Sequence, residues 1–238
     1  MLAMIVADND IARVTVVAYC PGIGADKDYS KKHPEQDIVR TLEVDASELS
    51  DIGALKNKCL AGAGEKAGLT EADLVLGLTS KVRLGSAEPA HLFLLDFGCR
   101  ACEGNLTAAV SFVEPLGAGF ILESGRSYHY YLNGVFSTGQ WRDLLGRVAA
   151  EDSLKSSRLL DHDWVGLQLS RGYSVLRLTA NEHKPHLPRI VEAVGYQPVS
   201  VGPNQMRLFD SSVDAPTRRI ERAGTIIKFF YILTKHQH

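Results

Sequence analysis

The chain has 238 residues, of which 45% are hydrophobic and 23% are charged, a balance typical of folded globular proteins. This composition excludes a disordered, collagen-like or membrane-spanning chain. The 26 basic and 28 acidic residues leave a formal net charge of -2, so any contact with nucleic acid must be local.

The N-terminal sequence MLAMIVADND predicts no secretory signal, because no basic residue precedes its apolar run and Asp8 interrupts that run early. We therefore expect a cytoplasmic protein. The four cysteines are too few for a disulfide scaffold and fit a reducing compartment. Cys99 and Cys102 form a C-x-x-C pair, but no second pair completes a zinc site, which favours packed thiols.

The first part of the chain predicts an α/β unit. Residues 13–19 (RVTVVAY) are rich in β-branched side chains and predict a strand. Residues 20–36 are rich in Gly, Pro, Lys and Asp and predict a loop. Apolar positions at helical spacing predict helices within residues 46–67.

The middle of the chain alternates strand and helix patterns. Residues 92–97 form an apolar run that predicts a buried strand, and residues 102–113 follow as a predicted helix. Residues 119–124 and 127–132 are two short strand-like runs joined by Gly-Arg, which predicts a hairpin.

Four further elements are expected towards the C-terminus. Ser137, followed by Gln three residues later, predicts the start of a helix. We expect a helix over 161–172, a strand over 173–179 and a short helix over 188–195 that ends at glycine. The pattern of residues 224–235 fits either strand or helix.

These elements predict the α+β class, with helices packed on a largely antiparallel sheet. No linker or repeat divides the chain, so we expect a single domain over 1–238. Within it we distinguish an N-terminal α/β unit of about 1–89, a core of about 90–195 and a C-terminal extension of about 196–238.

Three segments of the core carry chemistry-bearing residues in a fixed order. The first, LFLLDFG, ends a strand at Asp96, the second, SGRSYHYYL, contains Ser127 and His129, and the third, LLD, ends at Asp161 before RLTANEHK. Together they resemble the motifs of the archaeo-eukaryotic primase superfamily, which includes the small primase catalytic subunit and the primase-polymerases. There a strand ends in hhDhD, a later strand carries S-x-H, and an hD motif precedes an R-L-(P/T)-x-S/N-x-H-K-like segment. The resemblance spans about 92–184 and implies a primase-like core with an RRM-like sheet.

The S-x-H segment places two polar side chains together. Ser127 and His129 are two residues apart on a predicted strand, so they share one face, and Tyr128 and Tyr130 point to the other. A hydroxyl and an imidazole side by side can hold a phosphate or a sugar hydroxyl. The alternative is that His129 is an ordinary histidine on the surface of the sheet.

The acidic residues predict a metal site. A carboxylate at Asp96, after an apolar run, must be paired, hydrogen-bonded or metal-bound, or it caps the following helix. The resemblance implies that Asp96 and Asp161 bind Mg²⁺ or Mn²⁺, with Asp163 as a competitor for the second of these places. Gly98 stands where the family has its second acid, and Glu103 is a candidate replacement ligand.

Three basic residues are candidates for nucleotide binding. Arg177 alternates with the apolar Leu176 and Leu178, so we expect it on the surface side of its strand, where it can take a triphosphate or form a surface salt bridge. Arg126 lies in the predicted turn, and Lys184 lies in a polar loop. The resemblance implies that Arg177 and Lys184 contact phosphate or template. Arg126 is a candidate because a basic turn residue is exposed, and the alternative for both loop residues is that they are simply solvated.

The resemblance implies a catalytic function. We expect a nucleotidyltransferase of primase-polymerase type that transfers nucleotides from nucleoside triphosphates on a DNA or RNA template, weakened by Gly98 at the second acidic position. In this role Asp96, His129 and Asp161 are the expected catalytic residues, replication, repair or defence proteins are the expected partners, and no membrane is involved.

Two other functional classes stay open. One is a catalytically degenerate primase-fold module that binds nucleotide or nucleic acid, within a larger bacterial complex. The other is an interaction protein whose motif matches are coincidental. Basic residues in 217–235 offer a further nucleic-acid contact or a solvated face.

Overall fold

The computed structural model describes most of the chain. It divides into two units, Met1–Val194 and Gly195–His238. The described residues are 1–20, 38–61, 74–85, 89–155, 158–180, 185–198, 220–222 and 225–227.

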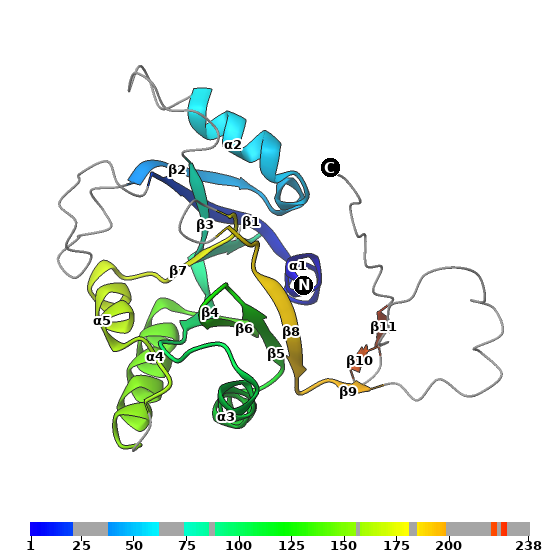
Figure 1. Cartoon of the computed structure of the whole chain (residues 1–238). Coiled ribbons are helices and arrows are strands. Elements are labelled where there is room, and N and C mark those ends of the chain that lie inside the picture. Colours follow the sequence, from blue (N-terminus) through cyan, green and yellow to red (C-terminus); the bar gives the residue numbers. More distant parts are fainter. Residues whose placement is uncertain are drawn as a thin grey trace. The chain divides into compact units, whose positions relative to one another are not determined.

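The first unit is built on an eight-stranded sheet (Figure 1). Its path is β2-β1-β3-β4-β6-β5-β8, with β7 paired to β3, and every neighbouring pair is antiparallel. The expected α+β class with an antiparallel sheet and flanking helices is therefore confirmed. The strands are β1 (Ile11–Tyr19), β2 (Ile38–Asp45), β3 (Val75–Leu84), β4 (Pro89–Asp96), β5 (Gly119–Glu123), β6 (Tyr128–Phe136), β7 (Val175–Arg177) and β8 (Arg189–Val194).

Strands β3 and β4 pair along only part of their length. Residues 81–83 of β3 pair with β4, whereas residues 77–79 pair with β7. The close approach of β7 depends on Gly77, because a Cβ atom there would lie 2.6 Å from Cγ1 of Val175. The C-terminal end of β4 is thereby left to other partners.

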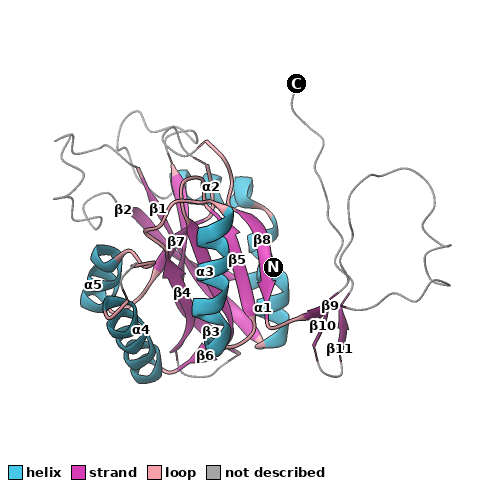
Figure 2. Ribbon diagram, turned by 60° about the horizontal axis from the view of Figure 1, so that its bottom comes forward, coloured by secondary structure: helices cyan, strands magenta, loops and turns pink. Residues whose placement is uncertain are grey.

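Three helices cover one face of strands β4, β5 and β6 (Figure 2). Alternate residues of β4 (Phe93, Leu95) and of β6 (Tyr128, Tyr130) pack there against α3, α4 and α5 around the buried Trp141. Because side chains alternate, Asp96 and His129 belong to the opposite face. The helical elements are α1 (Leu2–Asp8), η2 (Ala46–Ser50), α2 (Ile52–Ala61), α3 (Glu103–Val113), η4 (Glu114–Leu116), α4 (Thr138–Ser153) and α5 (His162–Arg171).

Most of the expected elements are confirmed by this arrangement. The 13–19 and 92–97 runs lie in β1 and β4, and the hairpin is β5–β6. Ser137 forms a capping box with Gln140 at the start of α4, as the spacing predicts.

The short helix expected over 188–195 is wrong. These residues form β8, which pairs antiparallel with β5 from Gly119↔Val194 to Glu123↔Arg189. The β-branched Ile190, Val191 and Val194 fit a pleated edge strand, and a hydrogen-bonding partner was available far away in sequence.

The second unit contains a small sheet of order β11-β10-β9, formed by β9 (Gln197–Pro198), β10 (Ile220–Arg222) and β11 (Thr225–Ile227). Of the ambiguous 224–235 segment, Thr225–Ile227 is thus strand. Most of the expected loop over 20–36, Lys184 and most of the basic segment 217–235 lie outside the described residues. No helix in the described part of the chain is long and apolar enough to span a membrane.

One buried histidine couples β4 to α4. His91 stacks on Trp141 with ring centroids 4.9 Å apart, its Nδ1 lies 2.9 Å from Oγ of Ser80, and its Nε2 lies 3.3 Å from Oγ1 of Thr138. Burial, with a smaller effect of Lys81, lowers the pKa of His91 from 6.5 to about 4.

The low pKa of His91 predicts a pH-dependent stability. Between pH 6.5 and about 4 the unfolded chain binds a proton that the folded protein excludes, so the free energy of unfolding falls as the pH falls through this range. The His91→Gln variant lacks this titrating group. Denaturant unfolding at several pH values should therefore give a free energy of unfolding that depends less steeply on pH, with a slope smaller by the equivalent of up to one bound proton. Equal slopes in the variant and the wild type would contradict this assignment.

Candidate functional site

Asp96 lies at the end of β4 directly opposite His129 on β6. The His129 Nε2 atom is 3.7 Å from Oδ1 of Asp96, and the two side chains are 3% and 19% exposed. The antiparallel register thus brings together a carboxylate and an imidazole that are 33 positions apart in the sequence. Asp96 is the more accessible of the two.

Asp161 lies on the other side of Asp96. An isolated antiparallel bridge joins Phe97 to Leu160, the N–H of Asp161 donates to the Asp96 carbonyl (3.1 Å), and the N–H of Gly98 donates to the Leu159 carbonyl (2.8 Å). In this register Asp161 is the cross-strand neighbour of Asp96. The main chains of the two predicted acids are therefore adjacent at one edge of the sheet.

The Asp161 backbone is extended, and its Oδ1 accepts the Trp164 N–H at 2.9 Å as the N-cap of α5. Asp163 falls in the first turn of that helix and is exposed. The two aspartates consequently diverge, and Asp161 is the one beside Asp96.

Main chain from the neighbouring segment lies against Gly98. A Cβ atom at this position would be 3.2 Å from the Leu160 carbonyl oxygen and 3.4 Å from Cα of Asp161. Any side chain at position 98 would push against this backbone, which is itself hydrogen-bonded to the end of β4. The segment that supplies Asp161 thus occupies the space next to the second acidic position.

Glu103, the candidate replacement ligand, is exposed in the first turn of α3. Among the described residues no three His, Cys, Asp or Glu side chains form a group that could hold a metal ion. Neither Glu103 nor Asp161 therefore joins Asp96 and His129 in such a group among these residues, and the roles of Glu103 and Asp161 as ligands stay predictions.

The turn between β5 and β6 lies at the same edge. Its Ser127 precedes β6, with Oγ 3.2 Å from Oγ of Ser124, and its Arg126 is exposed. The Arg126 carbonyl accepts the Ala101 N–H at 2.8 Å, which fixes the turn against the residues that follow β4. A hydroxyl and an exposed cation thus lie in the turn that leads into the strand of His129.

Arg177 differs from its expected place on the surface. It is only 6% exposed, and its guanidinium donates to the carbonyls of Ser124 (2.6 Å), His186 (3.1 Å) and Thr179. Burial lowers its pKa, and the nearby Tyr19, Tyr131 and Asp96 act in the opposite direction. The side chain ties β7 to the β5–β6 turn through main-chain carbonyls, so the expectation of a surface position is wrong.

Tyr131 is a site residue that the sequence analysis missed. It is 1% exposed, it lies on the His129 face of β6, and its hydroxyl has no hydrogen-bond partner among the described residues. Burial, and secondarily the negative charge of Asp96, raises the pKa of this phenol. Its position two residues after His129 in YHYY was the available signal.

Asp152 is the second missed residue. It is fully buried at the end of α4, where its carboxylate accepts the N–H groups of Leu159 (3.0 Å) and Leu160 (3.1 Å) and contacts Nε2 of His162 at 2.9 Å. These contacts hold the segment that carries Asp161. The sequence did contain a signal for this residue, because Asp152 falls at helical spacing on the same apolar face of α4 as Leu145 and Val148.

We expect Asp152→Asn to loosen this segment, because an amide cannot accept all of these donors. The free energy of unfolding should fall by about 2 kcal/mol, the cost of buried donors left unsatisfied. Hydrogen exchange at the Leu159 and Leu160 amides should accelerate. The matched control is Asp143→Asn, on the exposed part of the same helix, and wild-type exchange rates in Asp152→Asn would contradict the anchoring role.

Comparison with known proteins identifies the family of this chain. A family model described as archaeo-eukaryotic primase 1D-like matches residues 60–189, more than half of the chain and including β4, β6 and the Asp161 segment. No curated protein and no solved structure gives a match. The chain therefore belongs to the archaeo-eukaryotic primase 1D-like family.

Proposed function

We propose that the protein is a metal-dependent nucleotidyltransferase that adds nucleotides from nucleoside triphosphates to a strand paired with a DNA or RNA template. The observation that carries the proposal is the position of Asp96, which has His129 on one side and Asp161 on the other in a member of the primase family. Nucleotidyl transfer needs hard oxygen ligands beside groups that hold the triphosphate.

The donor set fits one divalent cation. Mg²⁺ and Mn²⁺ are bound through one or two carboxylates together with water and substrate phosphates, which matches Asp96 and the oxygen of Asp161 that does not cap α5. Such an ion neutralises the charge of the phosphates during transfer. A second ion would need another acid, and position 98 supplies none.

The remaining groups would bind the substrate. His129 and Ser127 present an imidazole and a hydroxyl that can donate hydrogen bonds to phosphate oxygens, and Arg126 supplies an exposed positive charge. Arg177 acts in this proposal as a positioning residue, because its donors hold the main chain at Ser124 and leave the turn in place. Lys184 remains an expected phosphate contact.

A second candidate is a module that binds nucleotide or nucleic acid without catalysis. The observation in its favour is Gly98, where the family's second acid is absent and the adjacent space is filled by the 160–161 backbone. Both candidate functions use the same nucleotide site. They differ in whether the bound nucleotide is incorporated into a strand.

Replacement of Asp96 separates these possibilities. We expect Asp96→Asn to reduce Mn²⁺-dependent incorporation into a primed template by at least about 100-fold, because the cation loses a charged ligand. The melting temperature of the unliganded protein should change little, since Asp96 is partly exposed. Primer extension followed on a gel, with thermal denaturation of the same samples, measures both quantities.

Asp163→Asn is the matched control, because it removes the same charge two residues from Asp161 on the exposed surface of α5. It should extend primers at the wild-type rate. If the wild type extends no primer but is stabilised by a triphosphate with Mn²⁺, the binding module replaces the enzyme. If Asp96→Asn extends primers normally, the assignment of the site fails.

Placing an acid at position 98, as the family has it, should not increase nucleotide incorporation. In Gly98→Asp the new side chain meets the Leu160 carbonyl, so we expect a loss of about 1–3 kcal/mol in stability and no gain in incorporation. Thermal melts and primer extension test this. Faster extension with an unchanged melting temperature would mean that the 160–161 backbone yields to an acid at this position.

A further inference from the structure

A groove of about 340 Å³ lies away from the Asp96 site, where β1, β3, the start of β4 and the start of α4 meet. Its lining residues include Arg13, Lys81 and Arg83, with Glu43 as the acidic member. The formal charge of the whole chain is -2, so this concentration of cations is a local feature.

Two cations are held on an aromatic ring beside the groove. Nζ of Lys81 lies 4.3 Å from the ring centroid of Tyr173, and Cζ of Arg171 lies 5.4 Å from the same centroid. The Nε and Nη2 atoms of Arg171 are buried and have no hydrogen-bond acceptor among the described residues. Arg171 does not line the groove, so its charge acts there through the field around Tyr173 and Lys81.

Helix α4 adds positive charge at the same place. Thr138, its first residue, lines the groove, so the positive end of a 16-residue helix lies there. Arg142, one turn further, has its Nη2 atom 3.9 Å from the position that a Cβ atom on Gly172 would occupy, and Gly172 is also a lining residue. Cations thus converge from two strands and two helices.

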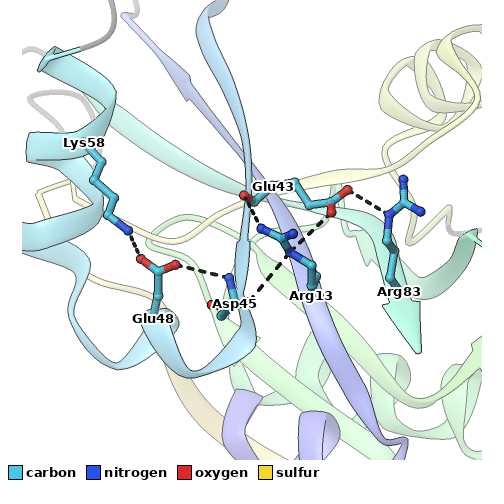
Figure 3. A network of polar contacts seen from close by, with 6 residues as sticks. All are labelled: Arg13, Glu43, Asp45, Glu48, Lys58 and Arg83. Atoms are coloured by element: carbon cyan, nitrogen blue, oxygen red, sulfur yellow. Dashed lines mark hydrogen bonds and ion pairs between the residues drawn. The ribbon is translucent and has the colours of Figure 1, made fainter. Parts of the chain in front are cut away.

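Glu43 in the groove and Asp45 beside it pair with the arginines. Glu43 pairs through its two oxygens with Nε of Arg13 (3.3 Å) and Nε of Arg83 (3.0 Å), and Asp45 lies 3.7 Å from Nε of Arg13 (Figure 3). The Nη atoms of Arg83 have no acceptor among the described residues. The lining residues of the groove thus include three cations, Arg13, Lys81 and Arg83, and one carboxylate, Glu43.

We propose that this groove binds the phosphodiester backbone of a nucleic-acid strand, with the exposed Lys81 and Arg83 contacting its phosphates. A strand presents one negative charge per nucleotide, which suits cations distributed over several elements. A compact triphosphate would concentrate its charge close to Glu43, whereas successive phosphates of a strand can each meet a separate cation. The contacts are to backbone only, so binding is independent of base sequence.

The test is fluorescence anisotropy of the full chain with a labelled 20-nucleotide oligothymidylate at several salt concentrations. We expect Lys81→Ala and Arg83→Ala each to weaken binding about fivefold and to reduce the salt slope by about one. Glu43→Gln should strengthen binding, because it removes the negative charge from the groove. Circular dichroism melts of each variant verify that the chain is folded.

Lys155→Ala is the matched control. Lys155 also lies over an aromatic ring, with Nζ 4.2 Å from the centroid of Phe112, but away from the groove. An equal loss of affinity in Lys155→Ala would show that only net charge matters and would overturn the proposal. Wild-type affinity in both groove variants would also overturn it.

Competition distinguishes a strand from free phosphate. Unlabelled oligonucleotide should displace the probe at micromolar concentration, and tripolyphosphate should not displace it below millimolar concentration. Displacement by tripolyphosphate at the oligonucleotide concentration would assign the groove to small phosphates instead.

This proposal stands apart from the proposed chemistry at Asp96. The groove variants should retain the stabilisation by triphosphate and Mn²⁺, which the Asp96 site supplies. Loss of primer extension alone therefore concerns the Asp96 site, and loss of strand binding alone concerns the groove.

Discussion

The candidate site depends on one buried carboxylate, Asp152. A charge that is fully buried in a protein is unfavourable unless hydrogen bonds replace its water, and Asp152 obtains these from the Leu159 and Leu160 amides and from His162. Because these donors follow one another in the chain, their partner fixes the whole segment. That segment then pairs with the end of β4, sets Asp161 beside Asp96 and occupies the space next to Gly98.

The separation of β3 from β4 makes room for this arrangement. β7 pairs with β3 where β4 has left it, and the 159–161 segment pairs with the continuation of β4. Arg177 connects the two sides by donating to the Ser124 carbonyl in the β5–β6 turn. The site is consequently held by main-chain contacts, which are insensitive to most surface substitutions. The cations of the groove lie on β1 and β3, which are other strands than those that carry Asp96 and His129.

Local patterns predicted the elements that depend on neighbouring residues. The capping box at Ser137, the β5–β6 hairpin and the apolar strand ending at Asp96 follow from spacing, turn chemistry and alternation. The two failures have non-local causes. Residues 188–195 became an edge strand because β5 offered an unpaired edge. Arg177 was buried because the Ser124 carbonyl, 53 positions away in the sequence, and the nearer carbonyls of Thr179 and His186 accept its donors.

The sequence alone determined the class of the fold, the family and the residues Asp96, His129 and Asp161 as a candidate set, because these rest on ordered motifs and local periodicity. Only the tertiary structure decided that Asp161 rather than Asp163 lies beside Asp96, that a main chain crowds Gly98, and that cations of β1 and β3 line one groove. These are contacts between residues far apart in the chain. They depend on strand register and on the burial of partners such as Asp152, which no local pattern encodes.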